Sequence, residues 1–595
     1  MNRPHPRTLP ACLATALVLA LAATYLFTPA QAARAGNAPA AGRTAAISPP
    51  SSFLPGRVSG LPMLTAAALR DITPAEAAPT PLPSPQSQVS VLTAVLKKME
   101  KNYSTYAGYE PGPVDILDYG IGKLWLQGID GAGTTIAVIE GWDDPDIAHT
   151  VAGYDHVFGL PNPQIQTIYP SGNGKLPAKC PAGMVVLGSY GSCEGWEGEL
   201  TLDVLTAHLI APYAKILISV TPADSEVNGD PASNVAPPEM MEALEAISSA
   251  HLANVISISD GTGESTYSYG DAEIAAQDPG ELAAAAAGIP VLVATGDCGV
   301  VQNLAVANGQ CEDVSTGPDT AAWDDSPWVT AVGGSEPDLS STGKRLGPDP
   351  LWHVDNVYSE GAGYSSVFKR PSYQDAVASI TNSGMRSVPD ITMDASNGTS
   401  EAAPMLAGVL ALATQVNKGN IGPINPALYS ALGPHGAADG IIDVVSGNDS
   451  AETAAGKVTV PGFTATKGFD VASGWGTVFA PRFVASLVAA TKAAQQEKPA
   501  RAEAAADLAE LRHDITLSPN NVAAGGVSYL LASGFLPGHP VKLMIGGTAV
   551  ATLTATALGT VAYMIDPALL KLASGAHLVT LHSMLVNVTA SFKSS

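Results

Sequence analysis

The chain has 595 residues, more than one hydrophobic core normally accommodates, so two or three folded units joined by linkers are expected. Hydrophobic residues make up 46% of the sequence and charged residues only 14%, which leaves much of the chain able to form buried cores. The formal net charge of −25 argues against nucleic acid or an anionic membrane surface as a partner.

The first 32 residues have the pattern of an export signal. Arg3 and Arg7 precede an apolar run over residues 9–27, and residues 30–32 (Ala-Gln-Ala) form a small-x-small cleavage site. The alternative is an uncleaved membrane anchor, because the apolar run nearly reaches spanning length. We expect cleavage, and therefore a secreted, extracellular protein that has no membrane contact once the signal is removed.

Four cysteines remain after the signal. The economical arrangement in an oxidising compartment is two short-range disulfides, Cys180–Cys193 and Cys298–Cys311. Zinc binding is the alternative, but no CxxC pair is present. The sequence therefore favours disulfides.

Residues 33–112 are rich in Ala, Pro and Ser and predict a linker or a degenerate propeptide, with a short helix at the amphipathic stretch from Val91 to Tyr103. From residue 113 to 490, buried β-rich runs alternate with helical stretches, which is typical of an α/β protein with a doubly wound, mostly parallel sheet. In such a fold the chemistry gathers at the carboxyl ends of the strands. The predicted strands are Thr134–Ile139, Lys215–Val220, Asn254–Ser259, Pro290–Thr295 and Trp328–Gly333, and the predicted helices are Gly198–Ile210, Glu281–Ala287 and Ser400–Val416.

The last hundred residues have a different pattern. Residues 491–513 are rich in alanine and charge and predict a linker helix, centred on the stretch from Lys492 to Arg512. Residues 514–595 alternate apolar and polar side chains between glycine-containing turns, which is the signal of a small all-β, immunoglobulin-like sandwich. We find no catalytic or ligand-binding motif in these residues, so they suggest a cell-wall contact, a substrate contact or a spacer role.

The strongest motif is the segment 398–404 (Gly-Thr-Ser-Glu-Ala-Ala-Pro), which leads into an apolar helix. Ser400 stands at the helix amino terminus, where the dipole and free N–H groups stabilise developing negative charge. Gly398 allows close backbone approach, and Pro404 is tolerated in the first turn because no N–H is needed there. The alternative is an ordinary helix cap, but the whole segment in an α/β protein favours a nucleophile.

A serine nucleophile needs a base. None of the eleven histidines lies in the His-Gly-Thr-His context of subtilisin-like enzymes, and His208 on its apolar helix is predicted to be structural. Glu199 and Asp203, four residues apart, would lie on one helix face and share a proton. A glutamate with a pKa of about 4 accepts the serine proton in acid, where histidine would be protonated. Taken alone, this spacing is more often a solvated acidic helix face.

A third element is Asp297, in the segment 294–299 (Ala-Thr-Gly-Asp-Cys-Gly) directly after an apolar strand. An aspartic acid at the carboxyl end of a strand points into the predicted site. Kept protonated at low pH, it can donate a hydrogen bond to an oxyanion. The alternative is a turn aspartate next to a disulfide.

Taken together, and in this order along the chain, these segments resemble the sedolisin (serine-carboxyl peptidase) family. The resemblance covers about residues 115–490 and includes the segments 211–216 (Ala-Pro-Tyr-Ala-Lys-Ile) and 326–334 (Ser-Pro-Trp-Val-Thr-Ala-Val-Gly-Gly). It implies a subtilisin-like fold and an endopeptidase that cleaves proteins or peptides in acid through a Ser-Glu-Asp triad and an acyl-enzyme. The implied roles are nucleophile for Ser400, proton acceptor for Glu199, tuning carboxylate for Asp203 and oxyanion donor for Asp297.

The same resemblance implies one structural calcium ion near the carboxyl end of the peptidase domain. Asp443 and Val444 match the first half of the family's site, and the segment 466–470 (Thr-Lys-Gly-Phe-Asp) matches the second half. Carboxylates and backbone carbonyls are the ligands that a hard cation prefers. The alternative is an ordinary acidic loop. The implied ligands are the carboxylates of Asp443 and Asp470 and the backbone carbonyls of Val444, Thr466 and Gly468.

The chain departs from the family in three places. Residues 388–390 (Val-Pro-Asp) lead within a few residues to Gly398, so a hairpin that shapes the substrate cleft is shortened. Asp260 stands where relatives carry tryptophan, which puts in doubt the extended network through Glu140, a residue that resembles the extra glutamate of kumamolisin-like members. The large folded propeptide of the family is replaced by residues 33–112.

These departures keep a second function open: a non-catalytic secreted or surface protein that retains the protease fold for binding. The presence of all four expected catalytic side chains favours the peptidase. A monomer is the default expectation for either function.

Overall fold

The computed structural model describes residues 76–106, 111–170, 193–221, 237–261, 278–302, 317–340, 345–354, 358–452, 457–497 and most of 515–594, together with a few residues between these segments. The signal, most of the predicted linker and Cys180 lie outside the described residues. No helix in the described part of the chain is both long and apolar enough to cross a membrane.

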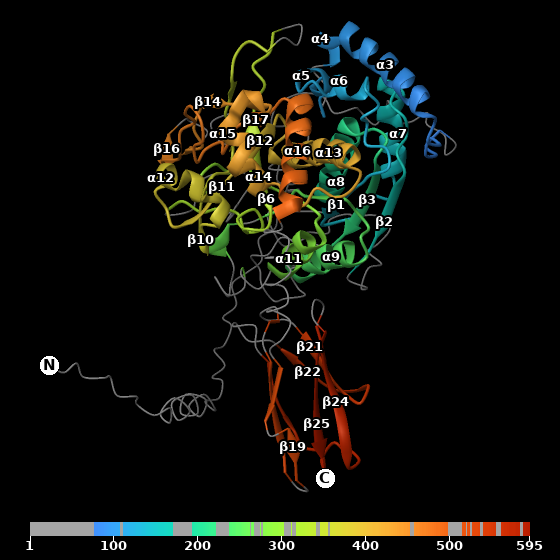
Figure 1. Cartoon of the computed structure of the whole chain (residues 1–595), viewed down its shortest axis with the longest axis vertical. Helices are drawn as coiled ribbons and strands as arrows, with labels where there is room; N and C mark the ends of the chain where they lie inside the picture. Colours follow the sequence, from blue (N-terminus) through green and yellow to red (C-terminus); the bar gives the residue numbers. More distant parts are fainter. Residues whose placement is uncertain are drawn as a thin grey trace, which may run out of the picture. The chain divides into compact units, whose positions relative to one another are not determined.

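Within the described residues, seven strands form one parallel sheet at the centre of the α/β domain (Figure 1). Each predicted strand is present to within two residues, whereas two four-residue strands at the edges were not predicted. In sheet order the strands are β12 (Ile391–Asp394), β6 (Thr330–Ser335), β5 (Val291–Ala294), β4 (Val255–Ile258), β1 (Thr135–Glu140), β3 (Lys215–Val220) and β2 (Ile165–Ile168).

Helices cover both faces of this sheet because its strands are apolar on both sides. In β1, Ile136 and Val138 pack in one hydrophobic cluster, and the alternate residues Ala137 and Ile139 pack in another. The first cluster is completed by α7 (Ile147–Phe158), α8 (Cys193–Ile210), α13 (Thr399–Asn417) and α16 (Ala480–Glu497), and the second by α9 (Pro237–Ser249) and α11 (Asp278–Ala287). The doubly wound α/β fold that the sequence predicted is therefore confirmed.

Helix α13 is the centre of the domain. Every residue from Thr399 to Thr414 is buried, as expected for a helix that is apolar all round. Gly408 lets α8 approach closely, since a Cβ at that position would lie only 2.4 Å from Cβ of Ile210. This contact fixes the two helices side by side and brings the amino-terminal part of α8 next to the first turn of α13.

The packed domain begins earlier than the boundary predicted at residue 113. The predicted helix is present as α3 (Pro85–Lys101), and its residues Leu92, Val95, Leu96 and Met99 are buried in the same cluster as α8 and α13. Their spacing of three and four residues gives an apolar stripe on one helix face. Burial of this stripe makes α3 part of the core of the α/β domain.

The helix near residue 490 also begins earlier than predicted. α16 starts at Ala480, and Phe483, Val484, Leu487 and Val488 on its inner side are buried in the core of the α/β domain. The predicted linker helix thus coincides only with its last turns, and residues 498–514 lie outside the described residues.

The C-terminal region is all β, as predicted. A three-stranded sheet and a five-stranded sheet are present, with Phe535, Leu543 and Phe592 among the buried residues. The first sheet has the order β18 (Ile515–Ser518), β20 (Ser528–Ala532) and β23 (Val561–Ile565), and the second β19 (Asn521–Val522), β25 (Asn587–Ser594), β24 (Gly575–His582), β21 (Pro540–Ile545) and β22 (Thr548–Thr554).

Candidate active site

The carboxyl ends of three neighbouring strands carry acidic residues. Glu140 is the last residue of β1, Asp260 comes two residues after β4, and Asp297 comes three residues after β5. Because the strands are parallel and adjacent, these three residues meet at one edge of the sheet. All three side chains are buried.

Ser400 reaches the same place from the first turn of α13. The cap residue Gly398 has φ +87°, and a Cβ there would lie 2.4 Å from Oδ2 of Asp297, so both the backbone conformation and the space require glycine. Ser400 is fully buried, and its carbonyl oxygen accepts a hydrogen bond of 3.3 Å from Oγ of Ser259. The backbone therefore holds the serine at the end of the helix, beside Asp297.

Glu199 and Asp203 on α8 face Ser400 and Glu140. Burial raises the pKa of Glu199 well above its usual value and the charge of Asp203 adds to this rise, whereas the Ser400 hydroxyl stabilises the carboxylate and lowers it. Burial raises the pKa of Asp203 to about 8, and contacts with Ser259 and Glu140 lower it in part. The predicted pair is thus a buried pair that retains protons, and not a solvated helix face.

Glu140 extends this pair. Burial and then the charges of Asp203 and Glu199 raise the pKa of Glu140 well above its usual value. In the described residues no group donates a hydrogen bond to the carboxyl oxygens of Glu140 or Asp203 in ordinary geometry. Because two carboxylates are both acceptors, their contact is satisfied only when one of them carries a proton.

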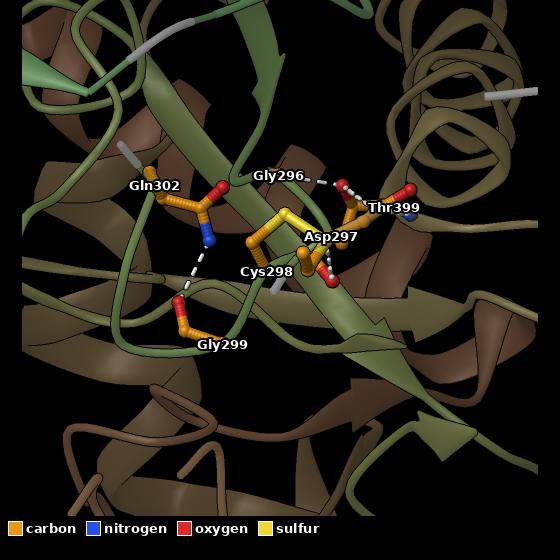
Figure 2. The surroundings of a disulfide bond; sticks show 7 residues. Gly296, Asp297, Cys298, Gly299, Gln302 and Thr399 are labelled. Carbon is orange, nitrogen blue, oxygen red and sulfur yellow. Dashed lines mark hydrogen bonds between the residues drawn. A yellow bond between two sulfur atoms is a disulfide. The ribbon is translucent and has the colours of Figure 1, made fainter. Parts of the chain in front are cut away.

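Asp297 is held on one side by Thr399 (Figure 2). Its Oδ1 accepts hydrogen bonds from the backbone N–H of Thr399, at 2.8 Å, and from the Thr399 hydroxyl, at 2.9 Å. The same hydroxyl oxygen accepts the N–H of Gly296 at 3.0 Å. Burial raises the pKa of Asp297 to about 6, and the two bonds from Thr399 lower it in part. Oδ1 is therefore occupied, and Oδ2 is the oxygen that can carry a proton.

The loop that carries Asp297 is braced from two directions. A disulfide joins Cys298 to Cys311 with a Cα–Cα distance of 5.0 Å, in the pairing predicted from the sequence. At the start of the loop, the buried Glu360 accepts hydrogen bonds from the Thr295 hydroxyl at 3.1 Å and from the N–H of Gly334 on β6. Both contacts limit the movement of the Asp297 backbone.

Ser400 and Asp297 line one pocket together with Asp260. The pocket has a volume of about 310 Å³, solvent-open space included. Burial raises the pKa of Asp260 to about 7, although the N–H of Gly261 lowers it in part. The other lining residues are Ser259, Gly261, Ala294, Gly296, Cys298, Gln302 and Thr399.

The two segments of the predicted calcium site also lie together. Asp443 Oδ2 accepts the N–H of Gly468 at 2.9 Å. Burial raises the pKa of Asp470, and the negative charge of Asp443 adds to this rise. Oδ1 of Asp443 is buried and has no hydrogen-bond partner in the described residues. Two carboxylates that repel each other and one unused carboxylate oxygen fit a cation. Val444 begins β14 (Val444–Ser446), and Thr466 donates its N–H to Asp470.

No group of three or more Asp, Glu, His or Cys side chains in the described segments is arranged to hold a metal ion. The predicted calcium site has only two carboxylates, so it depends on backbone carbonyls for its remaining ligands.

A second set of buried carboxyl groups, Glu264, Asp324 and Asp325, lies near β10 (Gly363–Lys369), which carries Ser365. The Ser365 hydroxyl lies within hydrogen-bond distance of Glu264 and of Asp325, the latter at 2.9 Å. Its oxygen also accepts two backbone N–H groups, so its single proton serves two carboxyl groups. Burial and the contact with Glu264 raise the pKa of Asp325, and burial also raises that of Asp324.

His208, predicted to be structural, makes a buried contact away from these residues. Its Nε2 lies 2.9 Å from Oδ1 of Asp155, and both side chains are inaccessible to solvent.

The sequence predictions missed Ser259, Thr399 and Glu360, which hold the reactive groups in place. Thr399 lies within the predicted motif and Ser259 ends a predicted strand, so the positions of both residues in the sequence could have indicated that they lie at the site. Glu360 lies in a loop and touches Thr295 only through the fold, and no local pattern indicates it.

Comparisons with known proteins give a consistent set of relatives. A sequence profile described as the subtilase family, Peptidase_S8, matches residues 188–497. Kumamolisin from Bacillus sp. (strain MN-32) is 29% identical over 409 residues, covering 64% of this chain and 64% of kumamolisin. Sedolisin from Pseudomonas sp. (strain 101) is 27% identical over 315 residues, covering 49% of each chain. Human tripeptidyl-peptidase 1 is 29% identical over 264 residues, covering 38% of this chain and 43% of the relative.

Among solved structures, Pseudomonas sedolisin, described as a serine-carboxyl proteinase complexed with two molecules of pseudo-iodotyrostatin, superposes with a TM-score of 0.50. The aligned residues are 25% identical and cover 60% of this chain and 94% of the sedolisin chain. The chain covers a smaller share of the three sequence relatives, between about two fifths and two thirds of their lengths.

Proposed function

Because this chain belongs to the sedolisin family of the subtilases, we propose that it is a serine-carboxyl endopeptidase that hydrolyses peptide bonds in acid through an acyl-enzyme at Ser400. One observation carries the proposal. Glu199, Asp203 and Asp297 are buried around the amino terminus of a single helix, next to the serine, and burial raises the pKa of each carboxyl group. Proteins or peptides would be the substrates.

In the first half of the reaction, Oγ of Ser400 attacks the scissile carbonyl carbon while Glu199 accepts the hydroxyl proton. The carbonyl π electrons move to oxygen, and the proton on Asp297 Oδ2 donates a hydrogen bond to this oxyanion. When the oxyanion returns its electrons, the C–N bond breaks and Glu199 gives its proton to the departing amine. Water then repeats the sequence in place of the serine and releases the acid product.

The reacting form needs an ionised Glu199 and a protonated Asp297. Lowering the pH protonates both groups and raising it ionises both, so this form is most populated at an intermediate pH. The pKa of Asp297, raised to about 6, sets the upper limit, since the oxyanion donor is progressively lost as the pH rises above that value. Asp203 and Glu140 share the protons that Glu199 must give up, because the pKa of both is also raised by burial.

Secretion and a structural calcium ion are part of the same proposal. The basic start, apolar run and Ala-Gln-Ala site support export, and so does a disulfide at Cys298–Cys311. Asp443, with its unused Oδ1, and Asp470 support calcium as a clip between residues 443 and 470.

A second candidate is a binding protein that retains the fold without catalysis. Two observations favour it: the pocket beside Ser400 is small, and the serine hydroxyl has no hydrogen-bond partner of ordinary geometry in the described residues. A catalytic serine often gains its hydrogen bond only when substrate binds, so the geometry of the free protein does not exclude catalysis.

Hydrolysis of a denatured protein by the purified mature chain, from pH 2.5 to 8 with calcium present, tests the two candidates. We expect a maximum in acid that is lost in Ser400→Ala and kept in Ser430→Ala, a matched change of an exposed serine. No Ser400-dependent cleavage at any pH, with both variants folded by circular dichroism, would reject the peptidase and leave the binding protein.

A further inference from the structure

Asp260 is a buried carboxyl group in the candidate active site that the proposed mechanism does not use. It lies in the segment after β4, is 4% exposed, and lines the same pocket as Ser400 and Asp297. Neither carboxyl oxygen has a hydrogen-bond partner of ordinary geometry in the described residues. A buried carboxylate without partners is costly, so it needs either a proton or a ligand.

The charges around Asp260 are all of one sign. Glu140 at the end of β1 and Glu199 on α8 both interact with it repulsively, since its charge raises the pKa of each. The only opposing influence on its own pKa is the backbone N–H of Gly261. Within the described part of the chain no basic side chain compensates this group. Apart from a proton, a positive partner for these carboxyl groups must therefore come from outside the protein.

The position of Asp260 indicates which part of a substrate would reach it. Asp297 and Ser400 must both meet the scissile carbonyl group, and both line the pocket that contains Asp260. The side chain of the residue that donates this carbonyl is attached to the Cα next to the carbonyl carbon, so it is the substrate side chain that lies closest to the pocket. A neutral side chain placed there would leave the carboxylate unpaired, whereas a cation would offset it and the two neighbouring glutamates.

We propose that Asp260 is a specificity-determining residue that binds a basic side chain, lysine or arginine, on the substrate residue whose carbonyl is attacked. The proposal rests on the peptidase function and names the substrate class of the same site.

The preference for a cation should depend on pH. Below its pKa of about 7, Asp260 in the free protein is protonated, so binding a cation must expel that proton. The preference for lysine over an uncharged side chain should therefore weaken as the pH falls and strengthen as it approaches 7. The groups that face Asp260, Glu140 and Glu199, ionise in the same direction and reinforce this trend.

The test uses two fluorogenic peptides that differ only in lysine or norleucine at the residue before the cleaved bond. The ratio of their kcat/KM values is measured from pH 4 to 7 for the full chain, for Asp260→Asn and for Asp375→Asn, a matched change of an exposed aspartate. We expect a ratio that rises with pH to about 30-fold or more, because an unpaired buried charge carries at least that cost. Asp260→Asn should bring the ratio close to one, and Asp375→Asn should keep it.

A ratio that Asp260→Asn leaves unchanged, or a preference for norleucine, would overturn the proposal. If Asp260→Asn does not fold, Asp260→Glu keeps the charge and should retain the lysine preference, which a purely structural role does not require. Failure of the peptidase itself looks different: neither peptide is cleaved at any pH. In that case binding of the two peptides to Ser400→Ala, with and without Asp260→Asn, still measures the charge preference, and equal affinities would reject it.

Discussion

The substitution Asp297→Asn separates the role of the oxyanion donor from that of the base. Oδ1 of Asp297 must accept the two hydrogen bonds from Thr399, so an asparagine keeps its carbonyl oxygen there and places its amide nitrogen where Oδ2 stands. The amide is isosteric with the acid, which matters because Gly398 packs against Oδ2. An amide donates a hydrogen bond at every pH, whereas the acid donates only while it is protonated.

The magnitude follows from the pKa of about 6. With that pKa, about a tenth of Asp297 remains protonated at pH 7 and about a hundredth at pH 8. The ratio of wild-type to Asp297→Asn kcat/KM should therefore be constant below about pH 5 and fall about tenfold per pH unit above pH 6. Glu199 titrates in both proteins, and because ionised Asp297 also raises the pKa of Glu199, the fall in this ratio reports the ionisation of Asp297 together with its effect on the base.

Steady-state kinetics with one fluorogenic peptide from pH 3 to 8 measures this ratio. Asp297→Ala is the control, since it removes the donor and should lower kcat by about 100- to 1,000-fold at acidic pH. A ratio that is independent of pH from 4 to 8 would refute the assignment of Asp297 as a proton-dependent oxyanion donor. Loss of activity in Asp297→Asn equal to that in Asp297→Ala would refute it as well.

Two further predictions concern stability. Removing calcium with a chelator should lower the Tm of the wild type by a few degrees, because a ligand that binds only the folded state stabilises it. The chelator should not change the Tm of Asp443→Asn. An equal shift in both proteins would contradict the calcium site. The free energy of unfolding should fall as the pH rises from about 4 to 8, because carboxyl groups with raised pKa values bind more protons in the folded state than in the unfolded state. Asp325→Asn should reduce this slope by up to about 1.4 kcal/mol per pH unit in urea denaturation, with Asp375→Asn as the unchanged control, and a stability that rises over this range would contradict the reasoning.

The central sheet could be predicted from the sequence because its strands are buried on both faces. In an α/β chain, short and mostly apolar runs such as Lys215–Val220 predict buried strands, and this strand has the bounds that the sequence predicts. β2 and β12 were missed because they carry polar residues, as in Ile165–Ile168, in which Gln166 is exposed. Edge and short strands are specified by the neighbours they pair with, and these are distant in the sequence.

The acidic residues of the site were predictable in part for a similar reason. The spacing of Glu199 and Asp203 places both on one helix face whatever the helix packs against. The spacing does not predict what surrounds these two side chains. Only the fold shows that this helix face is buried and lies next to Glu140 and Ser400. Because the sequence does not show the surroundings of a residue, it identifies Asp260 only as a departure from the family, whereas the structure places Asp260 in the pocket.

The buried carboxyl groups link the pH of the proposed reaction to the stability of the fold. The sequence has 54 acidic residues and 29 lysines and arginines, so at least 25 acidic side chains have no basic partner of their own. Arg386, which pairs with Asp390 at 2.6 Å, supplies such a partner inside the core. Elsewhere, at Asp203, Glu360 and Asp325, the compensating positive charge is a proton. A proton is available only where the solution is acidic enough to supply it. The condition that lets Asp297 donate to an oxyanion is thus the condition that keeps the surrounding carboxyl groups neutral, and a variant that moves the activity optimum toward neutral pH must also replace those protons with other hydrogen-bond donors.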